Sequence, residues 1–241
     1  MSRTTRRDIL RTSASAGSVA IASLFVSRAG FAETDPSAPT PVTSHTFSYF
    51  TPPEIDFIEA AVARLIPADE LGPGAKEAGV TFFIDHQLSG SFGRAETWYM
   101  QGPWKEGTPE QGYQLKLTPA QLYRVGIQDT DDYCRRTFNK RTFAGLGAED
   151  QDKILQGLEK GEVKLASAPA KDFFAMLWLN TNEGFFADPV YGGNRDFAGW
   201  KLIGFPGPRY NYVDEIEQYG KPYTLPTVGL MGRGGSAARK G

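Results

Sequence analysis

The fold class of this chain is decided by the stretch Thr51-Pro52-Pro53-Glu54-Ile55-Asp56-Phe57-Ile58-Glu59-Ala60-Ala61-Val62-Ala63-Arg64-Leu65-Ile66-Pro67. Its threonine and the glutamate three residues later form a capping box, and proline favours the first helical position. Apolar residues then recur at helical spacing until Pro67, which ends the run. We therefore expect a helix over 51–66.

The same signals recur along the chain. A Gly-Pro-Gly turn at 72–74 precedes an expected helix over 75–89, and the capping box Thr118-Pro119-Ala120-Gln121 opens another to about Phe138. A shorter amphipathic helix is expected over 148–159, and a last one from Ser167-Ala168-Pro169 to a stop at Gly184. No stretch alternates with period two, so we predict an all-α domain of about five helices over 47–233.

Two segments do not fit a plain helical bundle. Residues 89–117 and 185–241 are rich in glycine and proline, which we expect to prevent regular elements there, and both carry many aromatic side chains. Such side chains need a surface to bury against, and tyrosine and tryptophan are favoured interface anchors. We expect a long irregular loop and an extended, partner-wrapping C-terminal part, although the aromatics could instead pack on their own helices. Only 234–241 is expected to be a disordered tail.

Composition limits the chemistry that this chain can perform. It has 241 residues, 40% of them hydrophobic, and a net charge of −2, which argues against a nucleic-acid partner. The single cysteine, Cys134, excludes an intrachain disulfide and a cluster held by cysteines alone. The two histidines, His45 and His86, leave too few ligands for a typical zinc site.

The remaining reactive side chains have ordinary explanations. His86 follows Asp85 directly, a spacing at which helical side chains point apart, and we expect a surface or packing histidine. Cys134 stands before two arginines that could lower its pKa, but we expect a buried, inert thiol. The Asp188–Asp196 turn lacks the order of a calcium-binding loop, so its polar side chains are expected to bond nearby backbone. We predict no catalytic, cofactor-binding or metal-binding residue in this chain.

Residues 1–32 have the composition of an export signal. The pair Arg6 and Arg7 precedes a short, weakly apolar stretch that is too short for a transmembrane helix. The pattern resembles a twin-arginine (Tat) signal with cleavage after Ala32, and an ordinary Sec signal is the alternative. Residues 33–46 are expected to be a disordered tether. Because Tat exports folded proteins, often with a partner in place, a chain with so few ligands suggests a partner that carries the cofactor.

The C-terminal half carries a specific resemblance. The blocks Glu183–Asp196 and Gly199–Gly207 are similar to the signature of the gluconate 2-dehydrogenase subunit 3 family. Further similar pieces are Phe50–Glu54, Ala63–Pro67, Pro73–Val80, Trp98–Trp104 and Gly107–Gln114. The resemblance covers about residues 47–210 and the signal; the tail beyond Pro226 lies outside it.

This resemblance implies a three-part enzyme. A large flavoprotein of the glucose–methanol–choline type would oxidise a sugar, polyol or sugar acid with FAD, with or without an iron–sulfur cluster. A multihaem cytochrome c subunit would pass electrons to quinone at the inner membrane. The small subunit would carry no cofactor or catalytic residue, support maturation of the flavoprotein, and take it to the periplasm through the Tat translocase as a hitch-hiker.

Candidate interface residues combine large aromatic surface with two cations. They are Trp98, Tyr99, Trp104, Tyr113, Phe185, Phe186, Tyr191, Arg195, Trp200, Lys201 and Phe205. Internal packing is the alternative for each, and Arg195 could instead bond Asp188 or Asp196. Two other functions stay open: the chain could complete the active site of the flavoprotein, or it could be a free-standing periplasmic binding protein.

Overall fold

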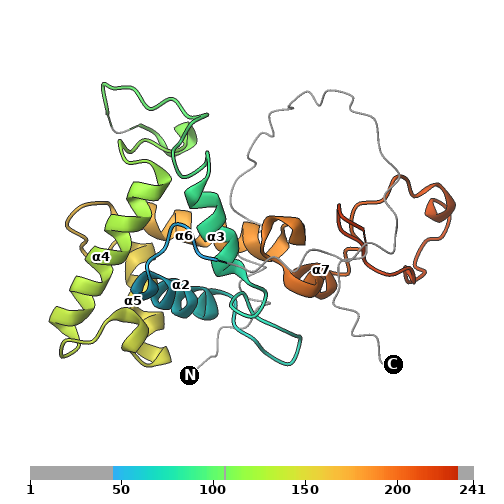
Figure 1. The fold of residues 1–241 in the computed structure, drawn as a ribbon, viewed down its shortest axis with the longest axis horizontal. Coiled ribbons are helices and arrows are strands. Elements are labelled where there is room, and N and C mark those ends of the chain that lie inside the picture. Colours follow the sequence, from blue (N-terminus) through green and yellow to red (C-terminus); the bar gives the residue numbers. More distant parts are fainter. Residues whose placement is uncertain (1–45, 106, 233–241) are drawn as a thin grey trace. The chain divides into compact units, whose positions relative to one another are not determined.

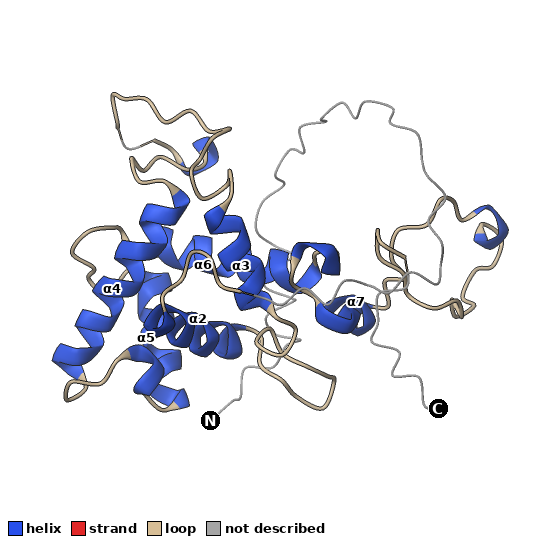
Figure 2. Ribbon diagram, viewed as in Figure 1, coloured by secondary structure: helices blue, strands red, loops and turns tan. Residues whose placement is uncertain are grey.

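The computed structural model describes residues 46–105 and 107–232. Six α-helices lie in this part of the chain, and it contains no β-strand (Figures 1 and 2). The helices are α2 (Pro52–Leu65), α3 (Val80–Ser89), α4 (Pro119–Thr137), α5 (Ala148–Lys160), α6 (Ala170–Phe186) and α7 (Ala198–Ile203). The predicted all-α class is confirmed. The export signal, most of the tether and the tail at 234–241 lie outside the described residues.

The two predicted capping boxes begin their helices. The backbone N–H of Thr51 donates to Glu54 Oε2 at 2.8 Å, at the start of α2. The N–H of Thr118 donates to Gln121 Oε1 at 2.9 Å, and Thr118 Oγ1 accepts from the Gln121 N–H at 3.3 Å, at the start of α4. Each box satisfies N–H groups that the helix itself leaves unpaired. Local side-chain chemistry therefore explains both helix starts.

Two expected helix boundaries were wrong. The second helix begins at Val80 rather than at residue 75, because Ala75–Gly79 form turns that end with Gly79 in the left-handed region. Helix α6 continues through Gly184 to Phe186. Gly184 is buried there, and a Cβ on it would lie 2.8 Å from Phe83 Cδ1. This glycine therefore serves the close approach of α3 and α6 rather than ending a helix.

Helix α6 is the centre of the core. It packs against α2, α3, α4 and α5 along its length and against α7 at its end (Figure 1). The fully buried aromatic rings of Phe57, Tyr123, Phe143 and Phe173 lie between these helices. The Tyr123 hydroxyl donates to Asn180 Oδ1 at 2.9 Å, which satisfies two buried polar groups.

A buried carboxylate joins the N-terminal segment to α3. Asp85 accepts hydrogen bonds from the backbone N–H groups of Ser48, Tyr49 and Phe50, at 2.8, 3.0 and 2.8 Å, and from the Ser48 hydroxyl. Its neighbour His86 is exposed, as expected for two adjacent helical positions. One side chain on α3 therefore accepts four hydrogen bonds from the segment that enters the helical domain.

The short helix α7 corrects the expectation that glycine and proline prevent regular structure beyond residue 185. Asn194 makes this helix possible through contacts on both sides of its turn. Its Nδ2 donates to the Ala187 carbonyl at 2.7 Å, and its Oδ1 accepts from the Gly199 N–H at 2.8 Å. The buried Asn194 side chain thus links the end of α6 to the start of α7.

Candidate partner-binding surface

The structure separates the candidate interface residues into buried and exposed groups. Phe185 is fully buried and Trp200 is only 5% exposed, so the internal-packing alternative applies to both. Trp200 Nε1 donates to the Phe186 carbonyl at 2.7 Å, and the indole stacks on Phe197 with 5.3 Å between ring centroids. Phe205 meets the same indole edge-on at 4.9 Å while remaining exposed. These residues join α6, α7 and the start of the C-terminal segment.

Arg195 and Lys201 are both exposed, as a partner-binding role requires. Within the described residues Arg195 forms no ion pair with Asp188 or Asp196; its guanidinium lies 5.8 Å from the centroid of the Phe82 ring. Asp188 instead accepts from the N–H groups of Val190 and Leu230, at 3.0 and 2.7 Å. Backbone hydrogen bonds of Asp188 and Asn194 therefore hold this turn, as its composition predicted, and the suggested Arg195 pairing was wrong.

Phe186 and Tyr191 come together beside α3. They line a hollow of about 500 Å³ with Phe83 and Phe92, and Glu183 and Gln87 supply its polar side chains. Tyr191 is exposed and Phe186 is half-buried. The hollow is mainly apolar and lies on the surface, so these two candidates remain available to a partner.

The residues beyond Phe205 form a closed loop. None of them was among the candidate interface residues. The Val228 N–H donates to the Pro206 carbonyl at 3.2 Å, and we name residues 206–228 the C-terminal loop. Gly207 at its base has a φ of +87°, and a Cβ there would collide with the Val228 carbonyl. Only glycine fits this close crossing.

The C-terminal loop is held by few internal contacts. The Tyr212 hydroxyl donates to the Gly207 carbonyl at 3.0 Å, and the rings of Tyr212 and Tyr223 lie 6.0 Å apart. The Arg209 guanidinium lies 5.5 Å from the centroid of the Tyr223 ring. These contacts shape the loop without giving it an apolar core of its own.

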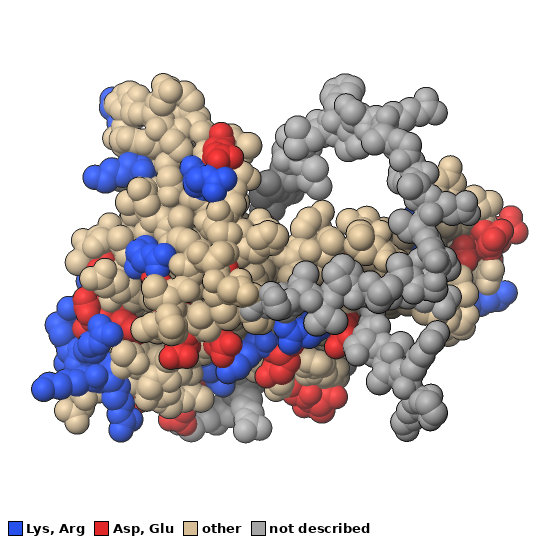
Figure 3. All heavy atoms as spheres, viewed as in Figure 1, with Lys and Arg blue, Asp and Glu red and all other residues tan. Residues whose placement is uncertain are grey.

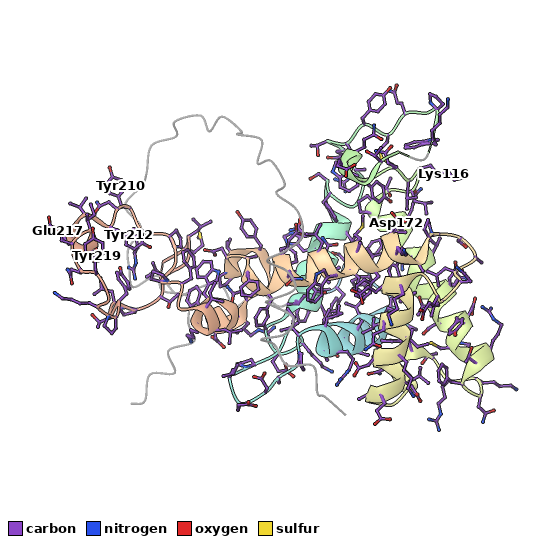
Figure 4. The ribbon with its side chains drawn as sticks, turned by 180° about the vertical axis from the view of Figure 1, so that it is seen from behind. Lys116, Asp172, Tyr210, Tyr212, Glu217 and Tyr219 are labelled. Carbon is purple, nitrogen blue, oxygen red and sulfur yellow. The ribbon has the colours of Figure 1, made fainter. Side chains whose placement is uncertain are left out.

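Apolar side chains of the C-terminal loop are exposed to solvent. Figure 4 labels three of its tyrosines and Glu217, all on this one segment. Tyr219 is 86% exposed, and the other exposed apolar residues are Tyr210, Tyr212, Val213, Ile216 and Leu225. Asp214, Glu215 and Glu217 add negative charge, and acidic side chains gather over this end in Figure 3. Alternating tyrosines within a Pro/Gly-rich stretch were the sequence signal for these residues.

The candidate reactive side chains lie in different surroundings. Cys134 is buried, as predicted, and burial raises the pKa of its thiol to about 12. His45 lies outside the described residues, and His86 is exposed on α3. No group of three histidine, cysteine, aspartate or glutamate side chains that could hold a metal ion occurs within 46–105 and 107–232.

Residues 46–105 and 107–232 contain no candidate membrane-spanning helix. None of the helices found there combines the length and the apolar character needed to cross a bilayer.

Comparison with known proteins identifies the family. The model of the family described as gluconate 2-dehydrogenase subunit 3 matches residues 52–207. This range spans all six helices of the described residues and ends at Gly207, at the base of the C-terminal loop. Comparisons with curated proteins and with solved structures give no match. The helical domain built around α6 therefore belongs to the gluconate 2-dehydrogenase subunit 3 family.

Proposed function

We propose that this chain is the non-catalytic small subunit of a periplasmic, FAD-dependent sugar, polyol or sugar-acid dehydrogenase, and that it binds the large flavoprotein subunit and supports its maturation. Membership of a family of dehydrogenase accessory subunits supports the assembly in general. A multihaem cytochrome c subunit completes the proposed complex and links it to the inner membrane. FAD and haem belong to the other two subunits in this proposal.

The exposed C-terminal loop is the observation that carries the proposed partner contact. Tyr210, Val213, Ile216 and Tyr219 are all exposed, although burying such side chains is worth about 1.5–3 kcal/mol each. Contiguous exposed apolar side chains typically mark a protein–protein interface. Their negatively charged neighbours, Glu217 among them, favour a partner surface that combines apolar and basic side chains.

Removing the apolar side chains of the loop tests this contact. The triple variant Val213→Ser, Ile216→Ser, Tyr219→Ser should fold normally, because all three side chains are exposed. Its affinity for the flavoprotein should fall by about 30-fold or more, as measured by co-purification and titration of the two subunits.

The matched control uses exposed leucines outside the loop. Leu71→Ser and Leu179→Ser should leave co-purification unchanged. Retention of full affinity by the triple variant would refute the role of the loop. A complex that assembles normally but loses turnover would instead favour a subunit that completes the flavoprotein active site.

Export of the partner is part of the same proposal. Residues 1–32 would carry the bound flavoprotein through the Tat translocase, so replacing Arg6 and Arg7 together by lysine should leave the flavoprotein in the cytoplasm. Fractionation and assay of FAD-dependent dehydrogenase activity measure the outcome. Flavoprotein found in the periplasm of cells that carry only this variant would refute the hitch-hiker role.

A further inference from the structure

The segment between α3 and α4 contains a cavity that is lined by four of the candidate interface residues. The cavity measures about 760 Å³, within the range of about 300–1,000 Å³ usual for small-molecule sites. Its aromatic lining consists of Trp98, Tyr99, Trp104 and Tyr113. It is separate from the C-terminal loop in sequence and in lining residues.

The inner wall of this cavity is held in place by packing. The Trp98 ring meets Tyr113 at 5.0 Å and Phe92 edge-on at 5.7 Å, and all three pack against the main core. The Tyr113 hydroxyl donates to the Leu117 carbonyl at 2.6 Å. Two aromatic rings are thus fixed before any ligand arrives, which reduces the entropy cost of binding.

The outer aromatic side chains are unusually exposed. Tyr99 is 80% exposed and Trp104 is 42% exposed, although both line the cavity. Large apolar rings at the mouth of a cavity offer flat faces on which a ligand can stack.

The polar lining supplies complementary hydrogen-bonding groups. Gln111 Oε1 accepts from the Thr108 N–H at 2.8 Å, which leaves the Gln111 amide N–H groups for a ligand. Gln114 Nε2 donates to the Gln111 carbonyl at 3.0 Å, which leaves Gln114 Oε1 as an acceptor. Among the described lining residues, Lys105 carries the only charge.

This lining matches a carbohydrate. Each sugar hydroxyl both donates and accepts hydrogen bonds, as a neighbouring amide donor and amide acceptor require. The C–H faces of a sugar are apolar and can lie on aromatic rings, while a carboxylate would be attracted to Lys105. We propose that this cavity binds a carbohydrate of one or two sugar units, and that sugar acids bind more tightly than neutral sugars. This site would exist whether or not the partner proposal is correct.

Titration of the purified full chain, without partner subunits, tests the proposal. Sodium gluconate and glucose should bind saturably, with dissociation constants of about 0.1–10 mM measured by calorimetry and tryptophan fluorescence. Gluconate should bind about threefold or more tightly than glucose at equal ionic strength. Sodium propionate, an anion without hydroxyl groups, should not bind.

Variants assign the binding to this cavity. Trp104→Ala and Gln114→Ala should each weaken gluconate binding by about tenfold. Lys105→Met should remove the preference for gluconate over glucose. Trp178→Phe, on α6 and outside the cavity, is the matched control and should leave binding unchanged. Circular dichroism should show that every variant is folded, because the replaced cavity residues are exposed.

Two results would overturn the proposal. One is the absence of saturable binding of either sugar up to about 100 mM, far above the expected range. The other is a Trp104→Ala variant that binds gluconate as tightly as the wild type does. If the wild type binds no sugar, the Trp104→Ala variant could in addition lose co-purification with the flavoprotein. The latter result would assign these aromatic side chains to a subunit interface. If only the triple variant of the C-terminal loop loses affinity for the flavoprotein, that result concerns the proposed function and not the carbohydrate site.

Discussion

Replacing Asp85 by alanine is expected to lower the free energy of unfolding by about 3–5 kcal/mol, because four hydrogen bonds to a buried carboxylate are lost together. The Asp85 side chain is 3% exposed and accepts from Ser48, Tyr49 and Phe50. The Phe50 N–H would be left buried without its acceptor. Urea unfolding of the full chain, followed by circular dichroism, measures the change.

Asp85→Asn separates the role of charge from that of shape. One amide oxygen can still accept, while the amide nitrogen faces N–H donors, so we expect an intermediate loss of about 2 kcal/mol. Asp56→Ala removes an exposed carboxylate from α2 and should change stability by no more than about 0.5 kcal/mol. Equal stabilities for Asp85→Ala and Asp56→Ala would show that the segment at 48–50 does not depend on Asp85.

Replacing Trp200 by alanine is expected to cost about 3–5 kcal/mol of local or global stability, the usual range for a buried tryptophan. The substitution removes the stacking on Phe197, the edge contact with Phe205 and the hydrogen bond to Phe186. These contacts join α6 to α7 and to the base of the C-terminal loop. Thermal unfolding, together with hydrogen exchange of the α7 amides, measures both levels of stability.

Trp200→Phe should retain most of the ring packing and lose only the N–H donor, at a cost of about 1–2 kcal/mol. Trp104→Ala, which removes an exposed indole, should change stability much less. If Trp200→Ala left stability and exchange unchanged yet weakened partner binding, Trp200 would be an interface anchor and its burial in the free chain would not matter.

Several features of the fold could be predicted because they depend on neighbours in the sequence. Helices α2 and α4 begin directly after the threonines of their capping boxes, and α5 ends at Gly161 in the left-handed conformation. A cap satisfies N–H groups within three residues of itself, and glycine needs no distant contact to adopt a positive φ. The burial of Cys134 likewise follows from its place on the apolar face of α4.

Other features depended on residues far apart in the chain and could not be read locally. Gly184 resembled a helix stop, but its small size leaves room for the side chain of Phe83 on α3, which lies 101 positions earlier in the chain. Asp85 could have been noticed as a charged residue at a buried position of an apolar helix, yet its partners at 48–50 are 35–37 residues away. Pairs of residues so far apart in the sequence are recognised only once the tertiary structure brings them into contact.

The sequence by itself determined the helical class, the main helix starts and the family, because capping, periodicity and motif blocks are properties of short stretches. Tertiary structure alone decided which aromatic side chains are exposed. Phe185 and Trp200 became core residues, while Tyr210 and Tyr219 stayed in solvent, although all four stand in similar Gly/Pro-rich surroundings. The physical reason is that burial depends on the surface that the rest of the chain brings to a residue: α6 and α7 cover the first two, and nothing in the described chain covers the others.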